Sequence, residues 1–226
     1  MVSRARANVL ARFWSAADLR RELDRFTGYR PDTPGVAHYG FDGLDLLLDG
    51  IFGAEGRTDS IELPDREMVH YEPVPARVIL DLVDHVSLTE SDVFYDLGSG
   101  LGRVVFLVNL LTGIRCRGVE IRTDLCATSR RVADRFRLAN VDIVAADARV
   151  ADYRDGTVFF MFTPFRGALL QAVLERLHDE ARRRPIVVCT YGSCTRRVFE
   201  LAWLTPQTPD ANGDYRLAIF RSDQAL

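Results

Sequence analysis

The stretch DVFYDLGSGLGRVVFLV, residues 92–108, constrains the fold of this chain more than any other. A short apolar run ends on Asp96, glycines follow at two-residue spacing, and a second apolar run begins at Val104. This pattern predicts a buried parallel strand, a tight turn and the start of a helix. Glycine suits the turn because it accepts unusual backbone angles and lets a ligand approach closely. The helix start then offers unpaired N–H groups to that ligand. The glycines are Gly98, Gly100 and Gly102.

The spacing of these glycines separates two classes of cofactor. The dinucleotide fingerprint GxGxxG, counted from Gly98, requires a third glycine at the position of Arg103. An acid at the strand end, Asp96, would repel a pyrophosphate, but it can pair with the ammonium group of a ligand that carries an amino acid. The sequence therefore opposes a nicotinamide or flavin cofactor.

The D-x-G-x-G-x-G pattern resembles motif I of the class I S-adenosylmethionine (SAM) methyltransferases. VFYDLGSGLGRVV, followed by GVEI, is also similar to the cofactor-binding core of the histone-lysine methyltransferases that lack a SET domain. The resemblance to class I methyltransferases extends over about residues 68–221. The resemblance to the histone-lysine methyltransferases covers the cofactor-binding half alone. The resemblance implies SAM as cofactor, and Arg103 stands where the narrower family has a cofactor-contacting glutamine. The turn residues that would bind it are Asp96, Gly98, Ser99, Gly100, Gly102 and Arg103.

Acids also end the next two predicted strands. Glu120 lies 120 − 102 = 18 residues after Gly102, where an acid in Rossmann-like folds accepts hydrogen bonds from a ribose diol. Its neighbour Ile121 is assigned to the same site. Asp147 and Ala148 follow the third strand and resemble the residues that contact the adenine in the family. The alternative is a surface acid for Glu120 and an ordinary turn residue for Asp147.

Two further segments carry the candidates for catalysis. The run MVHYEPVP, residues 68–75, resembles a segment that folds over the cofactor in a bacterial group of SAM methyltransferases, which assigns Tyr71 and Glu72 to the site. The fourth strand runs into Thr163-Pro164-Phe165, beside the transferable methyl group in the family. Amino-methylating members often have Asn or Asp and two prolines there, so this chain does not support methylation of a nucleobase nitrogen.

The catalytic candidates share an expected place at the carboxyl edge of the sheet, where ligands bind. Because methyl transfer from a sulfonium is an in-line displacement, positioning can supply most of the catalysis. A general base is needed only for a protonated acceptor. We assign catalysis to Thr163, Phe165 and Tyr71, with Thr163 also at the cofactor; Glu72, Tyr191 and His70 are neighbouring alternatives.

From residue 74 onward helices and strands alternate, which predicts a doubly wound α/β domain with a mostly parallel, seven-stranded Rossmann-like sheet. The Asn212-Gly213 dipeptide predicts a hairpin between the last two strands. Helical patterns occur over residues 1–26 and 42–52. They predict an N-terminal helical cap over residues 1–60 and a methyltransferase domain over residues 61–226. The predicted helices are 75–86, 102–112, 123–138 and 166–182; the predicted strands are 93–96, 116–121, 141–146, 157–162, 185–191, 201–206 and 215–220.

Composition limits the partners. A net charge of −3 and a pI near 5.8 argue against extended nucleic-acid binding, and no apolar run reaches the roughly 20 residues of a membrane span. The four cysteines lack metal-site spacing, so we expect no metal and a reducing, cytoplasmic setting. The resemblance of residues 68–75 to a bacterial group of methyltransferases implies a bacterial source. The expected function is methyl transfer to a protein side chain or a small molecule. The alternatives are a non-catalytic SAM-binding module and a nicotinamide-dependent oxidoreductase; the oligomeric state is undetermined.

Overall fold

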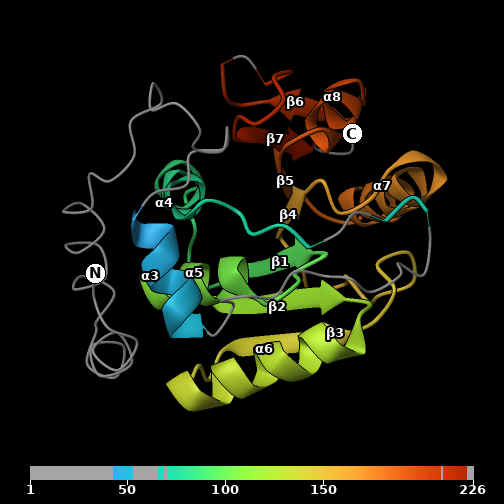
Figure 1. Ribbon diagram of the computed structural model, residues 1–226. Helices are drawn as coiled ribbons and strands as arrows, with labels where there is room; N and C mark the ends of the chain where they lie inside the picture. The colour runs from blue at the N-terminus through green and yellow to red at the C-terminus, as the bar shows by residue number, and fades with distance from the viewer. Residues whose placement is uncertain (1–42, 53–65, 69–70, 210, 223–226) are drawn as a thin grey trace, which may run out of the picture.

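The computed structural model describes residues 43–52, 66–68, 71–209 and 211–222 (Figure 1). Within these ranges the strands form one seven-stranded sheet in the order β3-β2-β1-β4-β5-β7-β6. Strands β1 to β5 run parallel, whereas β7 is antiparallel to both of its neighbours. The predicted doubly wound α/β sheet is therefore confirmed. The strands are β1 Val93–Leu97, β2 Arg115–Glu120, β3 Val141–Ala145, β4 Val158–Phe162, β5 Val187–Tyr191, β6 Leu204–Pro206 and β7 Ala218–Ser222.

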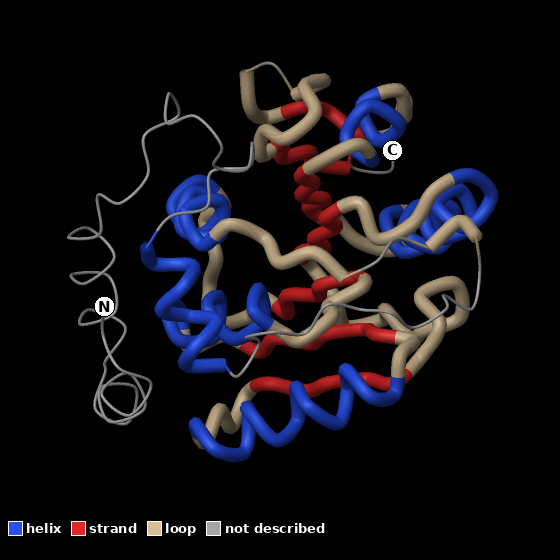
Figure 2. Tube along the Cα trace, viewed as in Figure 1, coloured by secondary structure: helices blue, strands red, loops and turns tan. Residues whose placement is uncertain are grey.

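Helices cover both faces of this sheet (Figure 2). One buried cluster joins the sheet to α3, α4, α5 and α6, and a second joins its other face to α7 and α8. The strand residues alternate between the clusters, because successive side chains of a strand point to opposite faces. The helices are α3 Gly43–Phe52, α4 Ala76–His85, α5 Arg103–Thr112, α6 Thr123–Phe136, α7 Gly167–Ala181 and α8 Cys194–Phe199.

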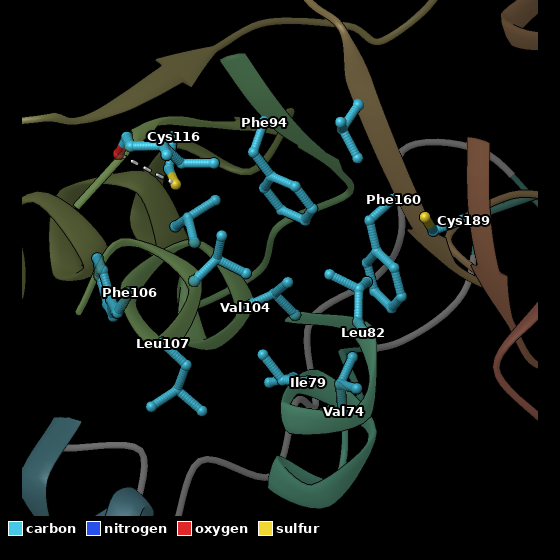
Figure 3. Packing of buried hydrophobic residues seen from close by; sticks show 14 of the residues in the cluster. Val74, Ile79, Leu82, Phe94, Val104, Phe106, Leu107, Cys116, Phe160 and Cys189 are labelled. Carbon is cyan, nitrogen blue, oxygen red and sulfur yellow. Dashed lines mark hydrogen bonds between the residues drawn. The ribbon is translucent and has the colours of Figure 1, made fainter. Parts of the chain in front are cut away.

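The first cluster fixes the helix that follows the glycine turn. Val104 of α5 packs between Ile79 of α4 and the sheet residues Phe94 and Phe160, all nearly inaccessible to solvent (Figure 3). Phe106, further along α5, is equally buried in the same cluster. Burial of each such side chain stabilises the fold by about 1.5–3 kcal/mol. The start of α5, and with it the glycine turn, is thereby held at the carboxyl edge of β1.

Helix α3 shares this core. Leu48 and Phe52 are 1% and 4% exposed, and the Phe52 ring lies 5.3 Å from Phe106 and 6.0 Å from Phe136, centroid to centroid. The helix predicted over 42–52 is thus present. The helical pattern of residues 1–26 lies outside the described residues, so the division at residue 60 stays a proposal.

The predicted terminal hairpin needs a correction. Strands β6 and β7 are antiparallel, as expected, but residues 207–217 connect them, so Asn212-Gly213 is not a two-residue hairpin turn. Tyr215 was expected in the last strand. Its φ of 55° places the backbone in the left-handed region, which a strand excludes, and β7 begins only at Ala218.

Candidate functional site

A cavity of about 490 Å³ opens at the carboxyl ends of β1, β2 and β4, where the strand order reverses between β1 and β4. Ligands of open α/β sheets bind at this reversal, and the volume is typical of a small-molecule site. The predicted site residues that line it are Tyr71, Glu72, Asp96, Gly98, Ser99, Gly100, Arg103, Glu120, Ile121, Asp147, Ala148, Thr163 and Phe165. Gly102 and Tyr191 do not line it, and His70 lies outside the described residues.

The three glycines of the turn have left-handed backbone, with φ values of 83°, 55° and 82° at Gly98, Gly100 and Gly102. A Cβ at Gly98 would overlap Pro164, and one at Gly100 would overlap the ring of Tyr71. Gly102 instead faces inward, where a Cβ would lie 2.7 Å from Cζ of Phe106. Two glycines therefore shape the cavity wall, and the third allows α5 to pack.

Glu120 supports the turn from the neighbouring strand. Its Oε2 accepts a hydrogen bond from the Gly100 N–H at 2.9 Å, and its Oε1 accepts one from the Arg122 N–H at 2.8 Å. Burial raises the pKa of this carboxyl above its usual range. A carboxylate has about four lone-pair sites, so Glu120 can hold the turn and still accept from a ligand hydroxyl.

Asp96 is the most buried acid of the cavity, with 3% of its surface exposed. Its pKa is raised to about 8, first by desolvation and then by the negative charge of Glu120. A cation placed beside it would favour its ionised form. This pair of acids thus makes one end of the cavity suited to a positively charged ligand group.

Ser99 adds a polar atom that the fold itself does not use. Its Oγ is buried and has no hydrogen-bond partner in the described part of the chain, and it lines the cavity. Gly118 of β2 makes room for it, because a Cβ there would lie 2.6 Å from this Oγ. A buried hydroxyl without a partner costs about 1–3 kcal/mol, which a ligand acceptor would offset.

Asp147, the acid after β3, is less available to a ligand than Asp96 or Glu120. Asp147 accepts hydrogen bonds from the Arg149 N–H at 2.8 Å and from Nη2 of Arg149 at 2.6 Å. Those bonds hold the pKa of Asp147 below its usual range. Asp147 lines the cavity, but its carboxylate is already engaged.

Arg103 lines the cavity wall with its guanidinium turned to other partners. Nη1 donates to Oδ1 of Asp45 at 2.8 Å and to the Val74 carbonyl at 3.2 Å, and Nη2 donates to Asp49. The side chain is 4% exposed. These contacts to α3 could not be read from sequence spacing, since 54 and 58 residues separate the partners.

The end of β4 has the most unusual backbone of the site. Thr163 has a φ of 41°, in the left-handed region that β-branched residues rarely adopt, and its Oγ1 accepts from the Ser193 N–H at 2.9 Å. A Cβ on Gly192 would overlap this Oγ1, so glycine is required there. Strain of this kind clusters at functional sites.

Phe165 is tied to the segment before α4. It forms an antiparallel β-bridge with Met68, and the Arg166 N–H donates to the Glu67 carbonyl at 2.9 Å. A Glu67 carboxylate oxygen also accepts from the Leu169 N–H at 2.8 Å, which caps α7. Residues 66–68 are thereby anchored beside β4.

Sequence reasoning missed part of the cavity wall. The Tyr215 ring lines the cavity and packs edge-on against Tyr191 at 5.9 Å, so the predicted Tyr191 lies behind it. No local signal identified Tyr215, because it lies in a turn before β7 and is brought to the cavity only by the fold. The other unforeseen residues that line the cavity include Met68, Arg122, Leu125, Phe162, Arg166, Leu169 and Ser193.

The described residues contain neither a metal-binding cluster nor a helix suited to cross a membrane. No group of three or more His, Cys, Asp or Glu side chains in this part of the chain could hold a metal ion. None of the helices described above combines the length and apolar character needed to cross a membrane.

Comparisons with known proteins agree with this geometry. The sequence model of the family described as "Histone methylation protein DOT1" matches residues 68–142, from the segment before α4 to the start of β3. No curated protein matches the chain significantly.

Solved structures extend the likeness. The structure of an RNA methyltransferase from Salinibacter ruber in complex with S-adenosylhomocysteine is 27% identical, with a TM-score of 0.52 over 67% of this chain and 92% of that one. The yhhF protein of Escherichia coli is 17% identical (TM-score 0.53; 67% and 90% covered). PH0226 of Pyrococcus horikoshii is 16% identical (TM-score 0.50; 65% and 89% covered). The sheet, the cavity and these matches together define a class I methyltransferase fold.

Proposed function

We propose that the protein binds SAM in this cavity and transfers its methyl group to an acceptor held at the carboxyl end of β4. The fold, the family match over the cofactor half and the similarity to a methyltransferase with bound S-adenosylhomocysteine make the chain a SAM-dependent methyltransferase. The observation that carries the binding mode is the buried Asp96 beside Glu120, because two acids at one ligand-sized cavity favour a positively charged ligand group.

The residues of the cavity fit the parts of SAM. Asp96 suits the ammonium group, and the partnerless Oγ of Ser99 can donate to the carboxylate. Glu120 has lone pairs left for the ribose diol, and the glycine turn lets the ligand approach bare backbone. For the adenine we propose Ile121 and Ala148 as packing surfaces, with Asp147 available only if its bond to Arg149 opens.

Catalysis follows from positioning. SAM, when bound, supplies a methyl group activated by a sulfonium. Thr163 is fixed by its bond from Ser193, and Tyr71 covers the glycine turn, so both can restrict where an acceptor lies. Phe165 is 7% exposed and excludes water from the same end of the cavity. In this proposal Thr163 and Tyr71 orient the acceptor, and Phe165 keeps water away from it.

We propose a protein side chain or a small molecule as acceptor. The wall around Thr163 is largely apolar and aromatic, with Met68, Phe162, Phe165 and Tyr215. Such rings can hold an amine by cation–π contact worth about 0.5–2 kcal/mol. A net charge of −3 supports this choice over RNA, the substrate class of the Salinibacter relative.

The experiment has two stages. Calorimetry should show binding of SAM and S-adenosylhomocysteine and none of NAD; NAD binding of equal strength would overturn the proposal. The enzyme is then given SAM with a labelled methyl group and separate protein, RNA and small-molecule fractions of a cell extract. Label in RNA alone would refute the proposed acceptor, and cofactor binding without label in any fraction would identify a non-catalytic SAM-binding module. Phe165→Ala should reduce labelling and leave S-adenosylhomocysteine affinity intact.

We also propose a cytoplasmic location in a bacterium. All four cysteines are buried and unpaired, which suits a reducing compartment. Two of the three similar proteins named above, from Salinibacter ruber and Escherichia coli, come from bacteria, which supports this source. Activity recovered from a cytosolic fraction would test the location.

A further inference from the structure

We propose that Arg103 and Asp45 form a clamp that holds the segment Tyr71–Val74 closed over the cofactor cavity. This inference rests on the proposed cofactor site and assigns Arg103 a positioning role. The segment is called the strap below. Its residues Tyr71, Glu72, Pro73 and Val74 all line the cavity.

The strap is attached at one end to the glycine turn and at the other end to the first residue of α5. At one end the Tyr71 ring packs on Gly100. At the other end the Val74 carbonyl accepts a hydrogen bond from Nη1 of Arg103 at 3.2 Å. Arg103 is the first residue of α5, directly after the turn. Either end of the strap can therefore move away from the cavity only if the contact at that end breaks.

Asp45 links the contact between Arg103 and Val74 to the start of α4. Its Oδ1 accepts from Nη1 of Arg103 at 2.8 Å and from the Ala76 N–H at 2.9 Å. Ala76 opens α4, and the preceding Pro75 provides no side-chain cap. One buried carboxylate thus caps the helix that follows the strap and orients the arginine that holds it.

The buried site of the clamp requires arginine at position 103. Asp45 and Arg103 are 2% and 4% exposed, and a buried charge without its partner is strongly unfavourable. A planar guanidinium can reach Asp45, Asp49 and the Val74 carbonyl together, whereas a lysine ammonium lacks that fixed fork. The clamp accordingly depends on arginine itself and not on positive charge alone.

The test compares Arg103→Lys and Asp45→Asn with Glu180→Gln in the full chain. Glu180 is a matched control, since it is also 2% exposed and pairs with arginines, Arg183 and Arg184, but does not line the cavity. Stability should fall in all three variants. Only the first two should show faster amide hydrogen exchange at Tyr71, Glu72 and Val74 in the ligand-free protein.

The second readout is the dissociation rate of S-adenosylhomocysteine. We expect Arg103→Lys and Asp45→Asn to raise it about tenfold, the effect of one charge-assisted hydrogen bond, with association changed less than about twofold. Glu180→Gln should leave both rates unchanged. Unaltered strap exchange in both clamp variants, or equal acceleration in Glu180→Gln, would overturn the clamp. If the wild-type protein binds no S-adenosylhomocysteine, the proposed function fails, and the exchange data still decide the clamp.

Discussion

The ring of Tyr71 lies against Gly100, in the space that a Cβ on residue 100 would occupy. This contact joins two segments that are 29 positions apart in the sequence (100 − 71) and closes one wall of the cofactor cavity. It also explains why the second glycine of the turn is needed. Both the left-handed backbone, with φ at 55°, and the neighbouring ring exclude a side chain.

Gly100→Ala should therefore weaken S-adenosylhomocysteine binding at least about tenfold, because the methyl group displaces Tyr71 or the turn. Gly113→Ala is the matched control, since Gly113 has a φ of 76° and nothing lies within 4 Å of its Cβ position. Both variants bear left-handed strain of about 1–2 kcal/mol. Denaturation should show a stability loss in both variants, larger for Gly100→Ala because of the ring contact, and calorimetry should show a binding loss at residue 100 alone. Equal affinities would remove the ring contact from the site.

Glu120→Ala should weaken SAM binding by about 1.5–3 kcal/mol, the scale of hydrogen bonds to a charged group. It removes the acceptor of the Gly100 N–H together with the proposed acceptor of the ribose hydroxyls. Asp142→Ala removes an exposed acid from the neighbouring strand β3 and should leave calorimetric affinity unchanged. Normal binding by the Glu120 variant would make this acid purely structural.

Cofactor affinity should rise with pH between about 6 and 8. Asp96 has a pKa of about 8 in the ligand-free protein, and an ammonium group beside it favours the ionised carboxylate. Binding near pH 7 should then release a proton, visible as a dependence of the calorimetric heat on buffer ionisation. Above about pH 8 the ligand amine itself loses its proton and affinity declines. Asp96→Asn should abolish the proton release; the same release in that variant would exclude Asp96 as its source.

The same group makes the stability of the ligand-free protein depend on pH. Because the folded pKa of Asp96 lies above the unfolded value of about 3.9, folding binds a proton in this range. The stabilising contribution is present below about pH 4 and is lost as pH rises through about 8. Asp96→Asn should accordingly gain stability relative to wild type between pH 5 and pH 9 in denaturation experiments. A difference that stays constant with pH would contradict this linkage.

Phe52→Ala should destabilise the whole domain by about 3–5 kcal/mol, because the ring is buried against Phe106 and Phe136. Phe199→Ala, at a side chain that is 44% exposed, should change the unfolding free energy by less than about 0.5 kcal/mol. If residues 1–60 formed a cap that unfolds separately, Phe52→Ala would not destabilise the rest of the domain. In that case the main unfolding transition would be unchanged in both variants.

The glycine spacing and the acids at the strand ends specify the cofactor half of the site from sequence alone. Gly98, Gly100, Asp96 and Glu120 all reach the cavity because strand ends and the turn between strand and helix are local features. Their chemistry follows from residue type and spacing along the chain. The same holds for the order of strands and helices, since hydrophobic periodicity depends on near neighbours.

Only the tertiary structure decided which distant residues meet. Arg103 turns to Asp45 on α3 and Asp147 engages Arg149, while Tyr215 leaves its expected strand and covers Tyr191. The sequence assigned the first two to the cofactor and did not include Tyr215. Side chains can pair only after folding brings them together. Because a buried charge without partners is costly, a group such as the Arg103 guanidinium binds the hydrogen-bond acceptors that folding places beside it. Local pattern thus determined the ligand class, and long-range packing determined which residues remain available to bind it.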